Sequence, residues 1–321
     1  MLRHIARRLL HLIPMLLGIT VVSFIIIQLS PGDFLAEIRL NPIVSQQTVD
    51  QMRANFGLDQ PLYIQYARWL WNAMRLEFGY SFAFQVPVTW LIGSRLLNSL
   101  LLSVISFTVA WLVAIPIGIY SARRQYTWVD NSVSLGAYVG ISTPTFFSGL
   151  FLLFLAFKSG WFPIGGLTSI DYEFLPWWGK VLDKAHHLIL PGVVLSILGV
   201  AGLMRQMRAS LLEVLRQDYV RTARSKGLAE RVVVNKHAVR NAINPLITIF
   251  GFGLGGLLGG AAILETVMGY PGIGKLLLDA TIQKDLYVVM AALVFGSVTL
   301  VVGNLIADIM LVVSDPRIRY D

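Results

Sequence analysis

Residues 218–228 of this chain read DYVRTARSKGL, and this basic stretch lies between two long apolar runs. Gly227 suits the left-handed C′ position at which helices end, so the stretch predicts a helix that stops there. Ser210 and Glu213 have the spacing of a capping box, which predicts that this helix begins near Ser210 and runs to Lys226. A second helix is expected beyond the glycine. The two expected helices indicate that residues 205–244 form a helix–turn–helix.

The second expected helix runs from Ala229 to Ile243, and Pro245 then suits the first turn of the next apolar run. On the first helix, apolar side chains recur on related turns at Leu211, Leu212, Leu215, Tyr219 and Ala223. An amphipathic helix that projects beyond lipid needs a protein groove for its apolar face, so we expect a partner protein there. The alternative is a basic helix that lies on anionic lipid.

The composition indicates a membrane protein. The chain has 321 residues, of which 55% are hydrophobic and 14% are charged, whereas soluble domains carry about 25% charged residues. Because the chain has no cysteine, it has neither a disulfide framework nor a thiolate metal site. Its net charge of +8 is more typical of membrane topology than of nucleic-acid binding, and we expect no nucleic-acid partner.

Hydropathy predicts six membrane-spanning helices, each about long enough for the ~20 residues that cross the hydrocarbon core. Backbone polar groups in lipid must be satisfied within each segment, so the fold class is all-α and polytopic. The first run lacks a small-residue cleavage site and is expected to be retained. The expected spans are Leu9–Leu29, Asn98–Ser121, Ser132–Phe157, Leu188–Met207, Asn244–Val267 and Tyr287–Val313. Prolines inside or beside these spans, such as Pro144 in the third, predict kinks.

The distribution of basic residues predicts the orientation. With the N-terminus inside, 16 of the 26 Lys and Arg residues lie in about 68 residues of inner segments, and 10 lie in about 120 residues of outer segments. The positive-inside rule therefore places both termini in the cytoplasm. The helical segment 205–244, between the fourth and fifth spans, is then cytoplasmic, and residues 30–97 form a large outer segment. Periodic apolar residues predict short amphipathic helices in that outer segment. The alternatives for its role are a structural cap and a docking platform for an extracytoplasmic binding protein, and the two are compatible.

Catalytic constellations are absent from the sequence. The five histidines are scattered, and no metal ligand set or nucleophile–base pattern emerges. Asp308 is an acidic residue well inside a span, and such a carboxylate is a functional candidate by default. We favour a structural partnership with backbone or an arginine for Asp308, because a proton-relay role has no other support.

The loop motif resembles that of one transporter family. Importers driven by ATP-binding-cassette subunits share an EAA motif with a later glycine, and alignment on Gly227 places Arg221, Thr222 and Ala223 at the EAA positions. Only Ala223 and Gly227 are retained. The peptide-permease branch of the family has its own version, approximately DYVRTARAKGL followed by RNAxxP, which this chain matches with serine at 225 and RNAINP at 240–245.

The resemblance extends from residue 3 to residue 319, and it identifies the chain as a permease of the oligopeptide/dipeptide type. It implies an N-terminal span with the outer segment over residues 1–94 and a five-helix permease core over residues 95–321. It also implies a second homologous permease subunit, two ATPase subunits, an extracytoplasmic binding protein and membrane lipids as partners. ATP and Mg²⁺ would be bound by the ATPases, so we expect no cofactor in this chain.

The resemblance further implies which residues transmit ATP-driven movement. The expected ATPase-coupling residues are Asp218, Tyr219, Arg221, Thr222, Ala223, Arg224, Gly227, Arg240 and Asn241. Thr143 and Pro144 are candidates for the translocation pathway. The predicted function is half of a peptide pathway in the prokaryotic cytoplasmic (inner) membrane, and the alternative is a secondary transporter or channel that needs no ATPase. The sequence does not separate peptides from nickel chelates, glutathione or oligosaccharides as cargo.

Overall fold

The computed structural model of the chain describes residues 2–29, 45–55, 57, 59–255 and 262–314. Within these ranges the protein is built from helices and turns, and the only strand-like pairing is a single antiparallel bridge between Tyr80 and Pro87. The expected all-α class is therefore confirmed. The chain divides into two compact units, Met1–Ser99 with Pro271–Val301, and Leu100–Tyr270 with Val302–Asp321.

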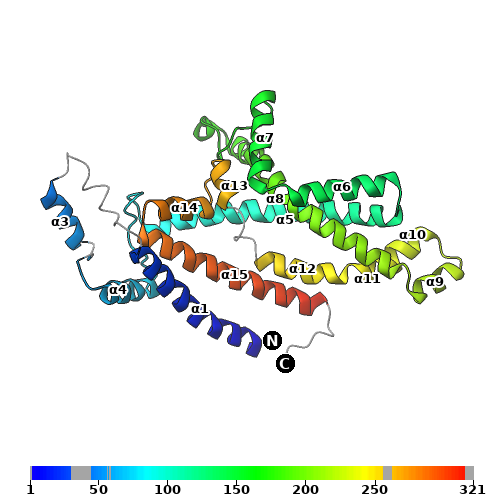
Figure 1. The fold of residues 1–321 in the computed structure, drawn as a ribbon, viewed down its shortest axis with the longest axis horizontal. Coiled ribbons are helices and arrows are strands. Elements are labelled where there is room, and N and C mark those ends of the chain that lie inside the picture. Colours follow the sequence, from blue (N-terminus) through cyan, green and yellow to red (C-terminus); the bar gives the residue numbers. More distant parts are fainter. Residues whose placement is uncertain (1, 30–44, 56, 58, 256–261, 315–321) are drawn as a thin grey trace. The chain divides into compact units, whose positions relative to one another are not determined.

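The first unit contains the first part of two long helices together with shorter ones (Figure 1). Its elements are α1 (Leu2–Leu29), α3 (Gln46–Asn55), α4 (Leu62–Met74), α14 (Ile273–Ile282), and the starts of α5 (Val88–Arg123) and α15 (Leu286–Ser314). The expected short helices of the outer segment are thus present as α3 and α4.

Buried polar contacts hold this unit together. The carboxylate of Asp285 is fully buried and accepts hydrogen bonds from the Ser81 hydroxyl (2.6 Å) and the Ala83 amide (3.0 Å). The Asn98 amide donates to the carbonyl of Pro271 at 2.9 Å. The Asp285 bonds tie the loop before α5 to the residue that precedes α15, and they satisfy a buried carboxylate that would be costly without donors. The Asn98 bond ties α5 itself to the segment before α14.

The second unit is a group of helices around α8. Its elements are α6 (Trp128–Ser142), α7 (Thr145–Ser159), a 3₁₀ turn η1 (Tyr172–Phe174), α8 (Trp177–Val214), α9 (Asp218–Ser225), α10 (Glu230–Val232), the π-helix η2 (Val233–Ala238), α11 (Val239–Ala242), α12 (Asn244–Gly255) and α13 (Ala262–Val267). Small side chains let α5 and α8 approach closely, since a Cβ at Gly118 would lie 2.8 Å from the Met204 carbonyl oxygen. At the C-terminal end of α8, helices α9, α10 and α11 form a compact group (Figure 1).

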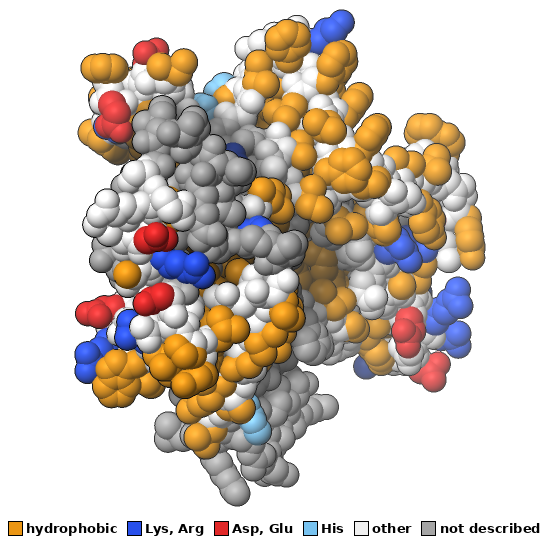
Figure 2. Space-filling model, turned by 60° about the vertical axis from the view of Figure 1, so that its left-hand side comes forward, with side chains coloured by type: hydrophobic (Ala, Val, Ile, Leu, Met, Phe, Trp, Pro, Cys, Tyr) orange, Lys and Arg blue, Asp and Glu red, His pale blue; other side chains and the backbone are white. Residues whose placement is uncertain are grey.

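Four of the described helices are long and apolar enough to cross a membrane: Leu10–Leu29 of α1, all of α5 and α8, and Leu286–Ile306 of α15. The paired helices α6 and α7 would make a fifth span. The predicted span Asn244–Val267 contains residues 256–261, which lie outside the described residues, so the count of six stays a prediction. Hydrophobic side chains cover much of the face in Figure 2, while charged side chains gather in small groups, as expected for a chain that lies in lipid.

Two predicted spans differ from the observed helices. We expected Ser132–Phe157 to be one helix with a kink at Pro144, but α6 ends at Ser142, α7 begins at Thr145, and the two are bent by 105°. The reason is local, because Thr143 has the extended conformation (φ −88°, ψ 121°) that a following proline favours. In contrast, α8 begins eleven residues before the predicted Leu188 and continues seven residues past Met207, so its ends extend beyond the ~30 Å hydrocarbon core.

Candidate functional site

The helical segment after the fourth span folds largely as a helix–turn–helix, but its first helix begins later than predicted. Ser210 does not cap a helix, because α8 continues through it to Val214 and buries its side chain. The Ser210 hydroxyl instead accepts a hydrogen bond from the Gln206 amide at 3.3 Å. The short helix α9 begins at Asp218, whose carboxylate lies at the positive end of the helix.

Gly227 has the predicted left-handed conformation, with φ +76°. Its amide donates to the Arg224 carbonyl at 2.9 Å, and the Lys226 amide donates to the Thr222 carbonyl at 3.1 Å. Among the described residues, no heavy atom outside the immediate chain neighbours lies within 4 Å of the position that a Cβ would take at Gly227. The glycine is therefore required by backbone conformation and not by crowding.

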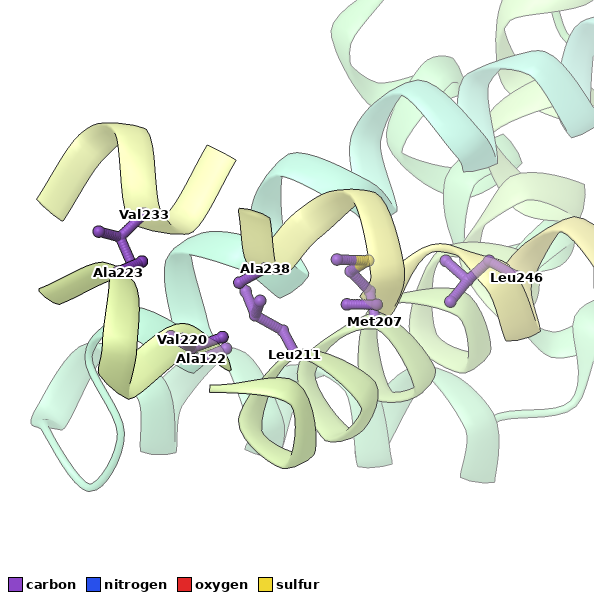
Figure 3. Packing of buried hydrophobic residues seen from close by; sticks show 9 residues of the cluster. Ala122, Met207, Leu211, Val220, Ala223, Val233, Ala238 and Leu246 are labelled. Atoms are coloured by element: carbon purple, nitrogen blue, oxygen red, sulfur yellow. The ribbon is translucent and has the colours of Figure 1, made fainter. Parts of the chain in front are cut away.

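The apolar face of α9 packs on the chain itself. Figure 3 shows Val220 and Ala223 within a buried cluster whose other members come from α5, α8, η2, α11 and α12. Val220 and its neighbour Leu211 on α8 are fully buried, and so is Val233 on η2. The expectation that this face fits a partner's groove is wrong, because other helices of the second unit cover it.

Two polar contacts fasten α9 to the helices that follow it. The Asn241 side-chain amide donates to the Tyr219 hydroxyl at 2.8 Å. Arg224 donates to both carboxylate oxygens of Glu230, from Nε at 3.1 Å and from Nη2 at 2.8 Å. The hydrogen bonds from Arg224, together with the charges of Arg224 and Arg123, hold the pKa of Glu230 below its ordinary value. The same hydrogen bonds, together with the charge of Glu230, raise the pKa of Arg224.

The outward face of α9 is polar and carries both charges. The Asp218 side chain is 97% exposed and that of Arg221 is 70% exposed, with 3.7 Å between the Asp218 Oδ1 and Arg221 Nη1 atoms. Thr222 is also exposed, and so is Arg240 on α11. The structure therefore divides the predicted coupling residues into an exposed face (Asp218, Arg221, Thr222 and Arg240) and residues that build the loop (Tyr219, Ala223, Arg224, Gly227 and Asn241).

One ionic contact near this site was missed by the sequence analysis. The carboxylate of Asp130 in the first turn of α6 accepts hydrogen bonds from Nε and Nη2 of Arg208 on α8, each at 2.7 Å. The Ser121 hydroxyl and the Tyr126 amide also donate to Asp130, the latter at 2.9 Å. The sequence does place an acidic residue in the first turn of one span and an arginine near the end of another. Because the two are 78 residues apart, the sequence did not indicate that they pair.

The pathway candidates Thr143 and Pro144 lie at the bend between α6 and α7. The Thr143 hydroxyl donates to the Val139 carbonyl at 2.7 Å, and the Pro144 carbonyl accepts from the amides of Phe147 and Ser148. No contact in the described part of the chain brings them to the α9 loop, so they form a separate prediction. The side chain of Asp308 lies outside the described side chains.

The first unit contains a polar cavity of about 260 Å³. Its lining comes from α4, from the turn before it, from the loop that follows it and from Tyr287 at the start of α15. Arg68 and Glu77 give it both charges, and the buried Trp69 indole N–H beside it has no acceptor in the described part of the chain.

Comparison with known sequences identifies the family. Residues 114–320 match the family described as binding-protein-dependent transport system inner membrane component, and residues 1–103 match its N-terminal family. The oligopeptide transport system permease protein AppB of Bacillus subtilis (strain 168) is 43% identical over 322 aligned residues that cover 100% of both chains. A protein of Brucella suis biovar 1 (strain 1330) that bears the name of a peptide permease is 41% identical, with 99% of each chain covered. This chain therefore belongs to the family of binding-protein-dependent transport system inner membrane components.

Proposed function

We propose that this chain is the membrane-spanning permease subunit of an ATP-driven importer and forms half of a pathway for peptides, with di- and oligopeptides as the cargo. Family membership and the peptide-permease names of its relatives support the cargo assignment. The chain would lie in a prokaryotic inner membrane with six spans and both termini in the cytoplasm. The bent pair α6–α7 and the partly described Asn244–Val267 would supply the third and fifth spans.

The complex would contain a second homologous permease subunit, two ATPase subunits that hold ATP and Mg²⁺, and an extracytoplasmic binding protein. The polar cavity beside α4 is our candidate for contact with the binding protein, since its charged and polar lining suits a polar loop. This chain would hydrolyse no ATP itself, and its part in the reaction cycle would be mechanical.

The observation that carries the coupling proposal is the exposed, charged outer face of α9 on a buried apolar base. An ATPase subunit would contact Asp218, Arg221 and Thr222, and the buried Val220 and Ala223 would transmit the displacement of α9 to α8 and α12. The Asp130–Arg208 contact would carry the movement of α8 to α6. Such coupling requires that the ATPase contact the loop differently in its two states, since equal affinity for both would shift nothing.

Substitution of Gly227 tests whether the loop couples ATP hydrolysis to transport. We expect Gly227→Val to cost about 1–2 kcal/mol at the turn, because a β-branched residue strongly disfavours positive φ. The variant should reach the membrane, hydrolyse ATP and import little peptide. Gly227→Asn is the matched control, since asparagine tolerates the left-handed conformation, and it should retain most uptake. Normal ATP-driven uptake by Gly227→Val in proteoliposomes would overturn the coupling proposal.

Native mass spectrometry of the tagged chain, extracted gently from its own membrane, tests the assembly. The expected mass is that of a complex with a second permease and two ATPase subunits. A stable lone chain or homo-oligomer without ATPase would contradict the proposal and would favour a secondary transporter.

A further inference from the structure

An apolar groove of about 530 Å³ lies between α5 and α8 in the second unit. On α5 it is lined by Leu101, Ile105 and Val109, and on α8 it extends from Val181 to Val193. Lys184 is the single charged residue in this lining, and it lies near the N-terminal end of the groove. The groove is therefore a hydrocarbon surface with a cation near its entrance.

Close packing of the two helices marks the other end of the groove. A Cβ at Gly192 would lie 3.8 Å from the Ile105 side chain, and one at Gly199 would lie 3.0 Å from the Ala110 side chain. Both helices run in the same direction at this point, because residue 192 lies beside residue 105 and residue 199 beside residue 110. The groove thus has a charged entrance and a closed, apolar floor.

The length of the groove matches one leaflet of a bilayer. The nine residue steps from Lys184 to Val193 rise about 14 Å along α8, and half of the hydrocarbon core is about 15 Å thick. The continuous apolar part of α8 begins at Leu188, one turn beyond Lys184. Lys184 therefore lies at headgroup level, where the exposed Trp177 and Trp178 of the same helix also belong.

The charge at the entrance is available to a ligand. The ammonium groups of Lys180 and Lys184 each lie 5.2 Å from the centre of the Tyr172 ring. Lys180 is paired with Glu173 at 3.2 Å, whereas no carboxylate of the described residues forms an ion pair with Lys184. Both lysines therefore lie near the Tyr172 ring, but within the described residues a carboxylate balances the charge of Lys180 and none balances that of Lys184.

We propose that this groove binds one acyl chain of an anionic phospholipid and that Lys184 binds the lipid's phosphate. An acyl chain in a bilayer is already out of water, so its burial in the groove does not select one lipid over another. Selection must come from the headgroup, and one lysine near an anionic headgroup corresponds to roughly a fivefold preference. The partner permease is the competing occupant, but a charged entrance at headgroup level and a depth of one leaflet favour a lipid.

The selectivity is tested on the complete transporter complex in nanodiscs with equal amounts of phosphatidylglycerol and phosphatidylcholine. Native mass spectrometry after release should find phosphatidylglycerol enriched among the lipids retained. We expect Lys184→Ala to reduce this enrichment about fivefold and Lys184→Arg to preserve it. Lys180→Ala is the matched control and should change nothing, because Lys180 contacts the same ring but does not line the groove. An unchanged ratio in Lys184→Ala would overturn the proposal.

A second experiment identifies what covers the groove. Because the chain contains no cysteine, Ile189→Cys introduces a single attachment point in the lining for a photoactivatable benzophenone. In the assembled complex it should cross-link to phospholipid. Cross-linking to another polypeptide instead would mean that a partner subunit fills the groove, and the lipid site would be rejected.

Discussion

Two arginine–carboxylate contacts in this protein have nearly the same geometry and lie in opposite surroundings. Arg208 donates two hydrogen bonds to Asp130, and Arg224 donates two to Glu230. The Asp130 side chain is 1% exposed, whereas that of Glu230 is 52% exposed. The first contact joins α6 to α8, and the second closes the turn between α9 and α10.

Because of this difference in burial, the Asp130–Arg208 contact is fixed, whereas the Glu230–Arg224 contact can be exchanged. Loss of one partner in a buried pair leaves the other charge without compensation, which costs several kcal/mol. An exposed pair contributes about 0–1 kcal/mol, because water can replace either partner. Under the proposed function, α6 and α8 would therefore move as one body, while the turn after α9 would change its polar partners when an ATPase subunit binds.

The largest effect is expected from Asp130→Ala. This change leaves Arg208 unpaired and removes the acceptor of the Ser121 hydroxyl, so the free energy of unfolding should fall by about 3 kcal/mol. The value lies near the low end for buried pairs, because the Arg208 side chain is 24% exposed. Unfolding in mixed detergent micelles measures the loss.

The double substitution Asp130→Asn with Arg208→Gln is the control for this prediction. Two neutral amides can bond to each other, so the double variant should regain at least half of the loss. A change below about 0.5 kcal/mol in Asp130→Ala, the range of ordinary surface substitutions, would mean that the pair contributes no more than an exposed one.

An intermediate effect is expected from Val220→Ala in the apolar base of α9. Val220 is fully buried, and removal of two methyl groups with a residual cavity should cost about 2 kcal/mol. Val232→Ala, at a side chain that is 39% exposed, should cost much less. Hydrogen exchange of the α9 amides in both variants locates the loss, and equal protection would contradict the assignment of α9 to a buried core.

The smallest effect is expected from the exposed pair. At neutral pH, Glu230→Gln should lower the free energy of unfolding by less than about 1 kcal/mol. Because Arg224 depresses the pKa of Glu230 below its ordinary value of 4.5, the contribution is complete above pH 4.5 and is lost as the pH falls through the folded-state pKa. The difference between the wild type and Glu230→Gln should therefore vanish in acid, and a difference that grows on acidification would contradict this interpretation.

The sequence predicted backbone features that a single residue determines. The left-handed turn at Gly227 followed from glycine alone, and a kink at Pro144 followed from proline. The 105° bend did not follow, since it depends on the conformation of Thr143 and on the packing of two helices. The start of α9 was misplaced because Ser210 and Glu213 satisfy the capping pattern inside a helix that continues.

Tertiary contacts explain the rest of what the sequence analysis missed. The polar contacts of Tyr219 and Arg224 join segments that both belong to the predicted helix–turn–helix. The motif did not indicate the partner of Tyr219 or of Arg224. The Asp130–Arg208 pair joins residues with no sequence relation, and the π-helix at Val233–Ala238 has no propensity signal. The outward charged face of α9 could not be recognised until Val220 and Ala223 were seen to pack inward.

Site-specific cross-linking from α9 in the complete complex tests the central claim most directly. Arg221→Cys and Tyr63→Cys place a benzophenone at similarly exposed side chains, 70% on α9 and 73% on α4. We predict that the probe at position 221 cross-links to an ATPase subunit with a yield that differs between nucleotide-free and ATP-bound states, and that the probe at position 63 does not. Failure of the probe at position 221 to reach the ATPase in a complex that retains both ATPase subunits would contradict the account.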